Sequence, residues 1–222
     1  MDEGTSESLD DWLDVDIPMP KTGARLLDSS KSRSHTACLN VSGVDRWDAY
    51  ALGFKQLGDV GVESLGQRRG PNEAIVYADT IVYAIMYNYR HYLEVRIKGL
   101  IVTADHLLDT PRAGSPTGHN LEALWARLRP MLEQIWPNVP EYDTVEEQIQ
   151  QFAAIDPGSD AFRYPLLRDG SPSLRGINGI DLLNVKEIID GIDSLLDGSG
   201  TGIYELLQQK SEAYAAAADY AP

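Results

Sequence analysis

Apolar residues recur with a helical period from about residue 43 onward. Four large apolar side chains at spacings of three and four predict one stripe on a first helix. They are Trp47, Tyr50, Phe54 and Leu57. The run GQRRGPNE interrupts the pattern, and Pro71 suits the first turn of a second helix, where an amide proton would have no partner. This second helix is predicted to run from about 72 to 104.

A third helical pattern follows in LEALWARLRPMLEQIW. Its apolar face consists of Leu121, Leu124, Leu128, Leu132 and Ile135. Pro130 is predicted to kink or divide the helix, because proline lacks an amide donor and clashes with the preceding turn. Further along, Thr144 and Glu147 have the spacing of a capping box, which predicts another helix start. The apolar edge of that helix consists of Val145, Ile149 and Phe152.

The C-terminal part combines an irregular segment with two more helical patterns. FRYPLLRDGSPSLRGINGIDLL has no sustained period, and Asn178–Gly179 within it is a candidate hairpin turn. Helices are predicted over about 183 to 197 and 202 to 217, with the glycines of GSGTG ending the first. The inward side chains of the first are Val185, Ile188, Ile189, Ile192 and Leu196. Because strands and helices do not alternate, the pattern predicts an all-α fold, a bundle of four to five core helices.

The first forty residues follow no such period. They open with an acidic run and continue with prolines and serines, which indicates a partly flexible arm over 1–40 ahead of a helical domain over 41–222. The alternative is a partner-docking segment, since apolar anchors stand between the acids. These anchors are Trp12, Leu13 and Ile17.

The formal net charge of −15 lies mainly at the two ends of the chain. Residues 1–20 hold seven acids and no base, and residues 141–222 hold fifteen acids and five bases. Such a chain repels a phosphate backbone at long range, so non-specific nucleic-acid binding is disfavoured. The single cysteine, Cys38, excludes an intramolecular disulfide, and no apolar run approaches the roughly 20 residues that span a bilayer. We therefore expect a cytoplasmic protein without membrane attachment.

The stretch YNYRHYLEVRIKG, residues 87–99, holds the densest set of chemically useful side chains. On a helix, Tyr89, Leu93 and Ile97 of this stretch would form one apolar face, together with Leu100 just after it. Arg90, Glu94 and Lys98 follow at intervals of four and form a charged ridge that supports the helix. The first interpretation is a core helix whose ridge is partly solvated. The alternative is that Arg90 and His91 face a cleft or a partner.

Motifs for metal, phosphate and nucleophilic chemistry are weak. GSGTG follows a helix and lacks a GK[ST] continuation, so helix-ending glycines explain it better than a phosphate loop. The four histidines stand outside HExxH and CxxC contexts, and no GxSxG elbow frames a serine. We expect neither a metal site nor a cofactor.

A recognisable order of motifs runs from about residue 43 to 213. It consists of WDAYALGFKQLGDV, YNYRHYLEVRIKGLI, GHNLEALW, VEEQIQQFAAIDPGSDAFRYP, INGIDLLNVKEIIDGI and DGSGTGIYELLQQKSEA. In this order the chain resembles the HEPN-like helical proteins of bacteria and archaea. The resemblance implies a bundle of four or five helices that often pairs as a dimer. Many such proteins belong to antiphage or toxin–antitoxin systems, and the active ones are metal-independent ribonucleases.

The catalytic signature that the resemblance implies is an arginine followed four to six residues later by a histidine. The histidine would act in acid–base chemistry on the 2′-hydroxyl, and the arginine would stabilise developing negative charge. Arg112 and His119, with six residues between them, fit this spacing. However, RAGSPTGH reads as a loop, and His119 has an alternative role in orienting the helix start beside Asn120. Arg163 of FRYP has no histidine within six residues.

These observations lead to one main hypothesis and two alternatives. We expect a HEPN-like interaction or sensor subunit of a prokaryotic defence or toxin–antitoxin type system, as a homodimer or docked to a larger partner. Its partner- or ligand-binding residues are predicted to be Arg90, His91, Glu94, Asn120, Arg163 and Tyr164. The first alternative is a metal-independent ribonuclease that uses His119 with Arg112, or Arg90 with His91. The second is a nucleotide-binding regulator that uses Arg90, Arg163 and the GSGTG amides. The isolated protein is expected not to cleave RNA.

Overall fold

The computed structural model describes residues 18–27, 32–39, 45–67, 71–110 and 116–219. The elements in these ranges are the 3₁₀ turn η2 Arg33–His35 and the helices α1 Arg46–Leu65, α2 Pro71–Leu107, α3 Leu121–Ile135, α4 Glu141–Ile155 and α5 Leu182–Asp219. The chain divides into two compact units, Met1–Val41 and Ser42–Pro222, and all five α-helices belong to the second. The predicted anchors Trp12, Leu13 and Ile17 lie outside the described residues.

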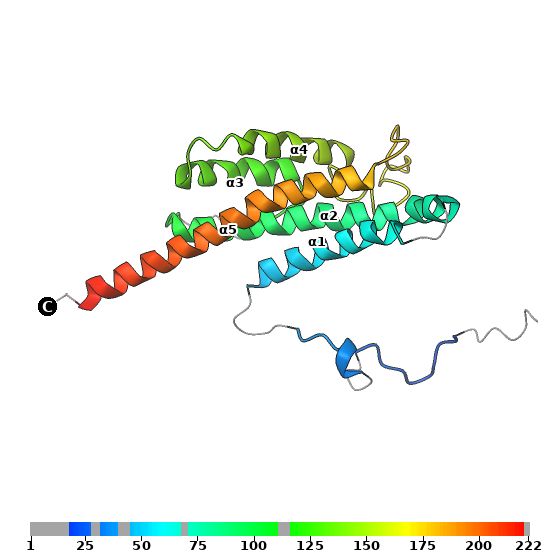
Figure 1. Cartoon of the computed structure of the whole chain (residues 1–222), viewed down its shortest axis with the longest axis horizontal. Coiled ribbons are helices and arrows are strands. Elements are labelled where there is room, and N and C mark those ends of the chain that lie inside the picture. The colour runs from blue at the N-terminus through cyan, green and yellow to red at the C-terminus, as the bar shows by residue number, and fades with distance from the viewer. Residues whose placement is uncertain (1–17, 28–31, 40–44, 68–70, 111–115, 220–222) are drawn as a thin grey trace, which may run out of the picture. The chain divides into compact units, whose positions relative to one another are not determined.

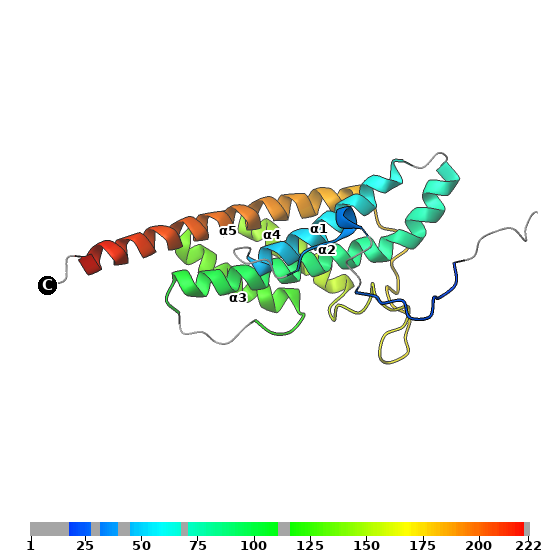
Figure 2. The same ribbon diagram turned by 90° about the horizontal axis from the view of Figure 1, so that it is seen from below.

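Helix α2 is the spine of the second unit. Helices α1 and α5 both pack against α2 and contact each other, whereas α3 packs against α2 and pairs with α4 (Figures 1 and 2). The predicted apolar face of α2 is confirmed as core, since Tyr89, Leu93, Ile97 and Leu100 are all buried. The described residues contain five α-helices and no strand, so the predicted all-α bundle is confirmed.

Helix α1 turns a different face to the core than the sequence pattern predicted. Tyr50 and Leu57 of the predicted stripe are 64 % and 59 % exposed, and of that stripe only Trp47 and Phe54 pack against the core. The residues that are buried instead are Ala51, Lys55, Gly58, Gly61 and Val62. The prediction of an apolar stripe is therefore wrong for half of its members.

Two glycines explain this register of α1. A Cβ atom at Gly58 would lie 2.6 Å from the ring of Tyr89, and one at Gly61 would lie 2.6 Å from Ile85 Cγ1. No side chain fits at such distances, so α1 approaches α2 through its smallest residues. The large apolar residues of the neighbouring face stay outside as a consequence.

Helix α3 differs from its prediction in continuity, and helix α4 differs in its first residue. Helix α3 continues through Pro130, which lies on the exposed side, so the predicted division is wrong. Helix α4 begins at Glu141, ahead of the predicted start at Thr144. The turn after Pro140 already satisfies an early amide, because Asp143 N–H donates to the Pro140 carbonyl at 3.3 Å. The apolar faces are confirmed: the four leucines of α3 and Val145, Ile149 and Phe152 of α4 are buried.

The two helices predicted at the C-terminal end are one helix, α5, and GSGTG lies in its middle. A Cβ atom at Gly200 would lie 3.1 Å from Arg96 Nη2, and one at Gly202 would lie 2.7 Å from the ring of Trp136. These close contacts outweigh a propensity cost of about 1 kcal/mol for each glycine. Gly200 and Gly202 therefore serve close packing, and neither helix termination nor a phosphate loop accounts for GSGTG, which lies within a continuous helix.

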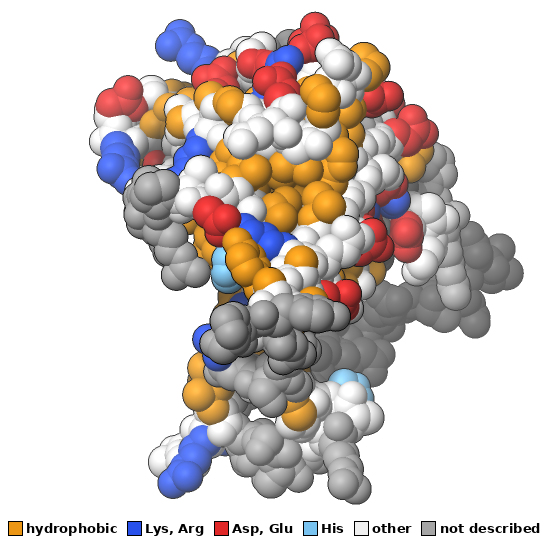
Figure 3. Space-filling view, turned by 90° about the vertical axis from the view of Figure 1, so that its left-hand side faces the viewer, with side chains coloured by type: hydrophobic (Ala, Val, Ile, Leu, Met, Phe, Trp, Pro, Cys, Tyr) orange, Lys and Arg blue, Asp and Glu red, His pale blue; other side chains and the backbone are white. Residues whose placement is uncertain are grey.

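The C-terminal end of α5 projects beyond the other helices (Figure 1). Lys210 still ties α5 to the end of α2, because its Nζ donates to the Leu107 carbonyl at 2.8 Å and pairs with Asp109 at 2.6 Å. Residues 211–218 beyond it are exposed. Figure 3 looks onto this end, where apolar side chains gather in the middle of the face and acidic side chains border it.

The segment between α4 and α5 is irregular, as predicted, but its turn lies elsewhere. An isolated antiparallel bridge joins Leu166 to Pro172, and Gly170 takes a φ of 81° in the turn between them. The hairpin turn predicted at Asn178–Gly179 is wrong. None of the described helices combines the length and the apolar composition that a membrane span needs.

Candidate functional site

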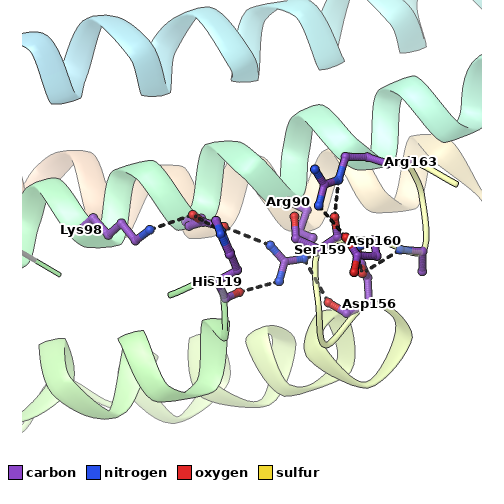
Figure 4. Close-up of polar contacts among 9 residues, drawn as sticks. Arg90, Lys98, His119, Asp156, Ser159, Asp160 and Arg163 are labelled. Carbon is purple, nitrogen blue, oxygen red and sulfur yellow. Dashed lines mark hydrogen bonds and ion pairs between the residues drawn. The ribbon is translucent and has the colours of Figure 1, made fainter. Parts of the chain in front are cut away.

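Arg90 lies in the middle of α2 and is completely buried, so the prediction of a partly solvated ridge is wrong here. Its Nε donates to the Asp156 carbonyl at 3.0 Å, and its Nη2 donates to the His119 carbonyl at 2.6 Å. Its Nη1 donates to Glu94 Oε2 at 3.2 Å. Arg90 therefore joins α2 to the start of α3 and to the end of α4 (Figure 4).

Glu94 is the second buried charge of this cluster and is 2 % exposed. Its Oε1 accepts from Lys98 Nζ at 2.8 Å and hydrogen-bonds with His119 Nδ1 at 2.9 Å. Burial acts to raise the pKa of the Glu94 carboxyl, but Lys98 and then His119 favour its charged form, so the pKa is lowered overall. Glu94 is therefore ionised at neutral pH.

Asp156 directly follows α4 and completes the buried cluster. Its Oδ1 accepts the amide protons of Asp160 and Ala161 at 2.8 and 3.0 Å. Its Oδ2 accepts no hydrogen bond, although Arg90 Nε lies 3.3 Å away as an ion pair. Sequence reasoning missed Asp156 because 66 residues separate it from Arg90. The available signal was an acid at a helix C-cap, which the helix dipole opposes and a nearby cation must offset.

His119 and Asn120 position the start of α3. The Asn120 side chain caps the helix by accepting the Ala123 amide proton at 2.9 Å. The His119 backbone carbonyl is held by Arg90, whereas its side chain is 64 % exposed and is held only at Nδ1, by Glu94. A buried carboxylate on Nδ1 of an exposed imidazole fixes the ring and leaves Nε2 for proton transfer.

His91 lies in different surroundings from its neighbour Arg90. The half-buried ring of His91 packs edge-on against Phe54, with 4.3 Å between centroids, and stacks on Tyr87 at 5.7 Å. Burial lowers the pKa of His91, with Glu94 opposing this shift. His91 is therefore a neutral member of an aromatic row at neutral pH.

Arg163 and Tyr164 extend this row. The Arg163 guanidinium lies 5.8 Å from the centroid of Tyr87 and 5.5 Å from that of Tyr164. Arg163 also pairs with Asp160 at 2.7 Å and donates through Nε to the Ser159 carbonyl (Figure 4). Its charge is thus neutralised locally, while Tyr164 is 56 % exposed.

Six of the eight predicted site residues therefore fall into two groups, while Asn120 caps α3. Those that meet in the buried cluster are Arg90, Glu94 and His119. Those that belong to the aromatic row are His91, Arg163 and Tyr164. Arg112 lies outside the described residues. The buried cluster can hold α2, α3 and α4 together, but a phosphate cannot reach Arg90 within it.

A second group of charges joins α1, α2 and α5, and we call it the seam. Arg96 pairs with Asp48 of α1 and, at 2.8 Å, with Asp197 of α5. Lys55 of α1 pairs with Asp190 of α5 at 2.6 Å. Tyrosine hydroxyls add to it, since Tyr89 donates to Asp59 and Tyr92 to Asp193. The seam explains why Lys55 points inward.

Within the described part of the chain, no group of three or more His, Cys, Asp or Glu side chains is placed to hold a metal ion. Comparison of the chain with protein-family models, with curated proteins and with solved structures gives no match.

Proposed function

We propose that this protein is a HEPN-like interaction or sensor subunit of a prokaryotic defence or toxin–antitoxin type system, and that it acts through a second copy of itself. The observation that carries this proposal is the outer face of α1. Every exposed residue of α1 between positions 49 and 60 is uncharged. The two charged residues in that stretch, Lys55 and Asp59, are turned toward the seam.

The apolar content of this face makes it a binding surface. Tyr50, Leu57 and Val60 are each exposed by more than half, at 64 %, 59 % and 59 %. Contiguous apolar surface of this kind on a folded chain marks an interaction site, and its burial contributes about 25 cal/mol per Å². The occupant that we propose is a second copy. Two chains of charge −15 repel each other, and an uncharged face lets them meet at a lower electrostatic cost than a charged face would.

Sedimentation equilibrium of the full chain tests the pairing. We expect the parent to be dimeric and Leu57→Glu to be monomeric, because the new carboxylate would be buried against its symmetry mate. Leu183→Glu is the matched control, since Leu183 is similarly exposed, at 66 %, but lies on α5. A monomeric parent, or equal effects of both substitutions, would contradict the proposal. Thermal melting confirms that both variants fold.

A second candidate function is metal-independent RNA cleavage, and the Glu94–His119 pair favours it. The pair has the arrangement of a general acid or base, with Nδ1 held and the ring exposed. The burial of Arg90 weighs against it, because the charge that would stabilise a phosphorane is enclosed. We therefore expect the isolated protein not to cleave RNA.

The assay is incubation of the full chain with labelled structured and unstructured RNAs in EDTA. His119→Ala is compared with His106→Ala, which removes an exposed histidine at the end of α2. Cleavage by the parent and by His106→Ala that is lost in His119→Ala would replace the lead proposal with the ribonuclease. No cleavage by any of the three supports the interaction subunit.

A further inference from the structure

A groove of about 890 Å³ lies between the first half of α2 and the segment that precedes α5. Both lie at the end of the bundle opposite the C-terminus (Figures 1 and 2). Its lining mixes polar and apolar groups, and the apolar side chains include Val82, Phe162, Leu174 and Ile180. The groove is large enough for two or three side chains of a bound segment, since pockets of about 300 to 1,000 Å³ hold drug-sized ligands.

Two exposed tyrosines stand on opposite walls of this groove. Tyr83 of α2 is 50 % exposed, and Tyr164 of the facing segment is 56 % exposed. Such rings supply large contact area at a small loss of side-chain entropy, which is why tyrosine is enriched in binding surfaces. The Arg163 guanidinium lies over the Tyr164 ring, 5.5 Å from its centroid, in cation–π range.

The backbone beneath the groove is held in a conformation that non-glycine residues rarely adopt. Leu174 has a φ of 55°, and Gly176 follows with a φ of 84°. A leucine in the left-handed region costs on the order of 1 kcal/mol, and such strain gathers at ligand-binding positions. The strained turn directs the segment so that Leu174 lines the groove.

The segment that forms one wall of the groove carries positive charge in an acidic chain. Arg168 lies in a hollow that adjoins the groove at Arg163 and Tyr164, and Arg175 directly follows Leu174 of the groove lining. Between residues 163 and 177 three arginines stand against one acid, Asp169. Arg163 is neutralised by Asp160, but the Arg168 side chain is 94 % exposed and reaches Asp160 only at 3.7 Å. Arg175 is exposed and has no ion pair with any described residue. The exposed guanidinium groups of both arginines can bind carboxylates.

We propose that this groove binds an acidic peptide segment of a partner protein. An apolar anchor of the segment inserts between Tyr83 and Tyr164, and its carboxylates pair with Arg168 and Arg175. Peptide is favoured over single-stranded RNA because RNA carries a negative charge at every nucleotide, so the chain's net charge of −15 repels it more strongly than a peptide with a few carboxylates. The inference deepens the proposed function by naming a partner's chemistry, and it concerns a different surface from α1.

The test is selection of a phage-displayed library of random peptides on the immobilised full chain. We expect enriched sequences to combine aspartate or glutamate with tryptophan, phenylalanine or leucine. The best peptide is then labelled and its affinity measured by fluorescence anisotropy. The double variant R168E/R175E should bind it about tenfold or more weakly, because two attractions become repulsions. Tyr164→Ala should also weaken binding.

Two matched controls separate the groove from general charge and apolar surface. Arg46→Glu reverses an exposed arginine on α1, and Tyr204→Ala removes a 72 % exposed ring on α5. Both should bind the peptide like the parent, and Leu57→Glu should do so as well, so that peptide binding and α1 pairing fail separately. The proposal is overturned if no peptide is enriched, if enriched peptides lack acids, or if R168E/R175E binds them unchanged. Capture of labelled single-stranded RNA in place of peptide would overturn it too.

Discussion

Arg90 and Arg96 lie on the same helix, α2, but bind different halves of the bundle. Arg90 faces α3 and α4, and the side chains of its partners Glu94 and Asp156 are 2 % and 1 % exposed. Arg96 faces α1 and α5, and its partners Asp48 and Asp197 are 64 % and 69 % exposed. The difference is one of solvent. The carboxylates around Arg90 are shielded from water, whereas those around Arg96 are hydrated.

Arg90→Ala should therefore be the most damaging single substitution of the charged residues. It leaves Asp156 buried without its cation and removes one of the partners of Glu94, which together cost about 3–5 kcal/mol of unfolding free energy. Urea unfolding followed by circular dichroism measures this loss. Arg129→Ala is the matched control, since Arg129 binds three carboxylates at the surface, where Arg90 binds two in the interior. Its loss should cost about 1 kcal/mol or less. Equal losses of unfolding free energy in Arg90→Ala and Arg129→Ala would show that burial of the ion pairs makes no difference.

Arg96→Ala should cost less, about 1–2 kcal/mol, because Asp48 and Asp197 regain water when the guanidinium is removed. The same urea experiment provides the number. Added salt should reduce the difference between parent and Arg96→Ala, while leaving that between parent and Arg90→Ala nearly unchanged. A salt response of the same size in both variants would show that the two halves do not differ in solvent access.

Two glycines on α5, Gly198 and Gly200, test how closely α5 packs against Arg96 in the seam. Gly198→Ala should raise the free energy of unfolding by about 1 kcal/mol, because nothing lies within 4 Å of the added Cβ. Gly200→Ala should lose this gain, since its Cβ would lie 3.1 Å from Arg96 Nη2. In an Arg96→Ala background, Gly200→Ala should recover the gain. If Gly200→Ala behaves like Gly198→Ala in the parent, close packing against Arg96 does not constrain α5.

The smallest effect concerns pH. Burial acts against the charged form of Glu94, but Lys98 and His119 outweigh it, so the folded-state pKa lies below the ordinary 4.5. A lowered carboxyl pKa contributes stability above 4.5 that is lost as the pH falls through the folded-state pKa. Glu94→Gln removes the ionisable carboxyl and with it this pH-dependent contribution to stability. The difference in unfolding free energy between parent and Glu94→Gln should be full at neutral pH and shrink below 4.5. A difference that stays constant with pH would contradict the assignment.

Periodicity predicted the helices because most of them bury a single face. The buried leucines of α3, the apolar edge of α4 and the core face of α2 all follow from spacing. The same reasoning fails on α1, where Gly58 and Gly61 set the approach to α2 and a lysine is turned inward. A pattern of large apolar residues cannot reveal a contact made by small ones.

The candidate site was predicted in part for a related reason. Arg90, Glu94 and Lys98 share one helix, so their intervals of four brought them together in the sequence. His119 and Asp156 come from other elements, and only the packing of α3 and α4 on α2 brings them to Arg90. Residue spacing also cannot show how deeply a side chain is buried. The burial of Arg90 and Glu94 is what indicates that they connect helices in the interior.

The hydrogen bonds of Arg90 also constrain the order in which the protein can fold during its synthesis. Its partners lie 29 and 66 residues further along the chain, at the His119 and Asp156 carbonyls. A ribosome adds about 5–20 residues per second, so several seconds pass between the synthesis of Arg90 and that of Asp156. During this interval Glu94 on the same helix can pair with Arg90 Nη1, but enclosing α2 would leave Arg90 Nε and Nη2 without their carbonyl acceptors. The nascent helix must keep Arg90 in water until α4 has emerged.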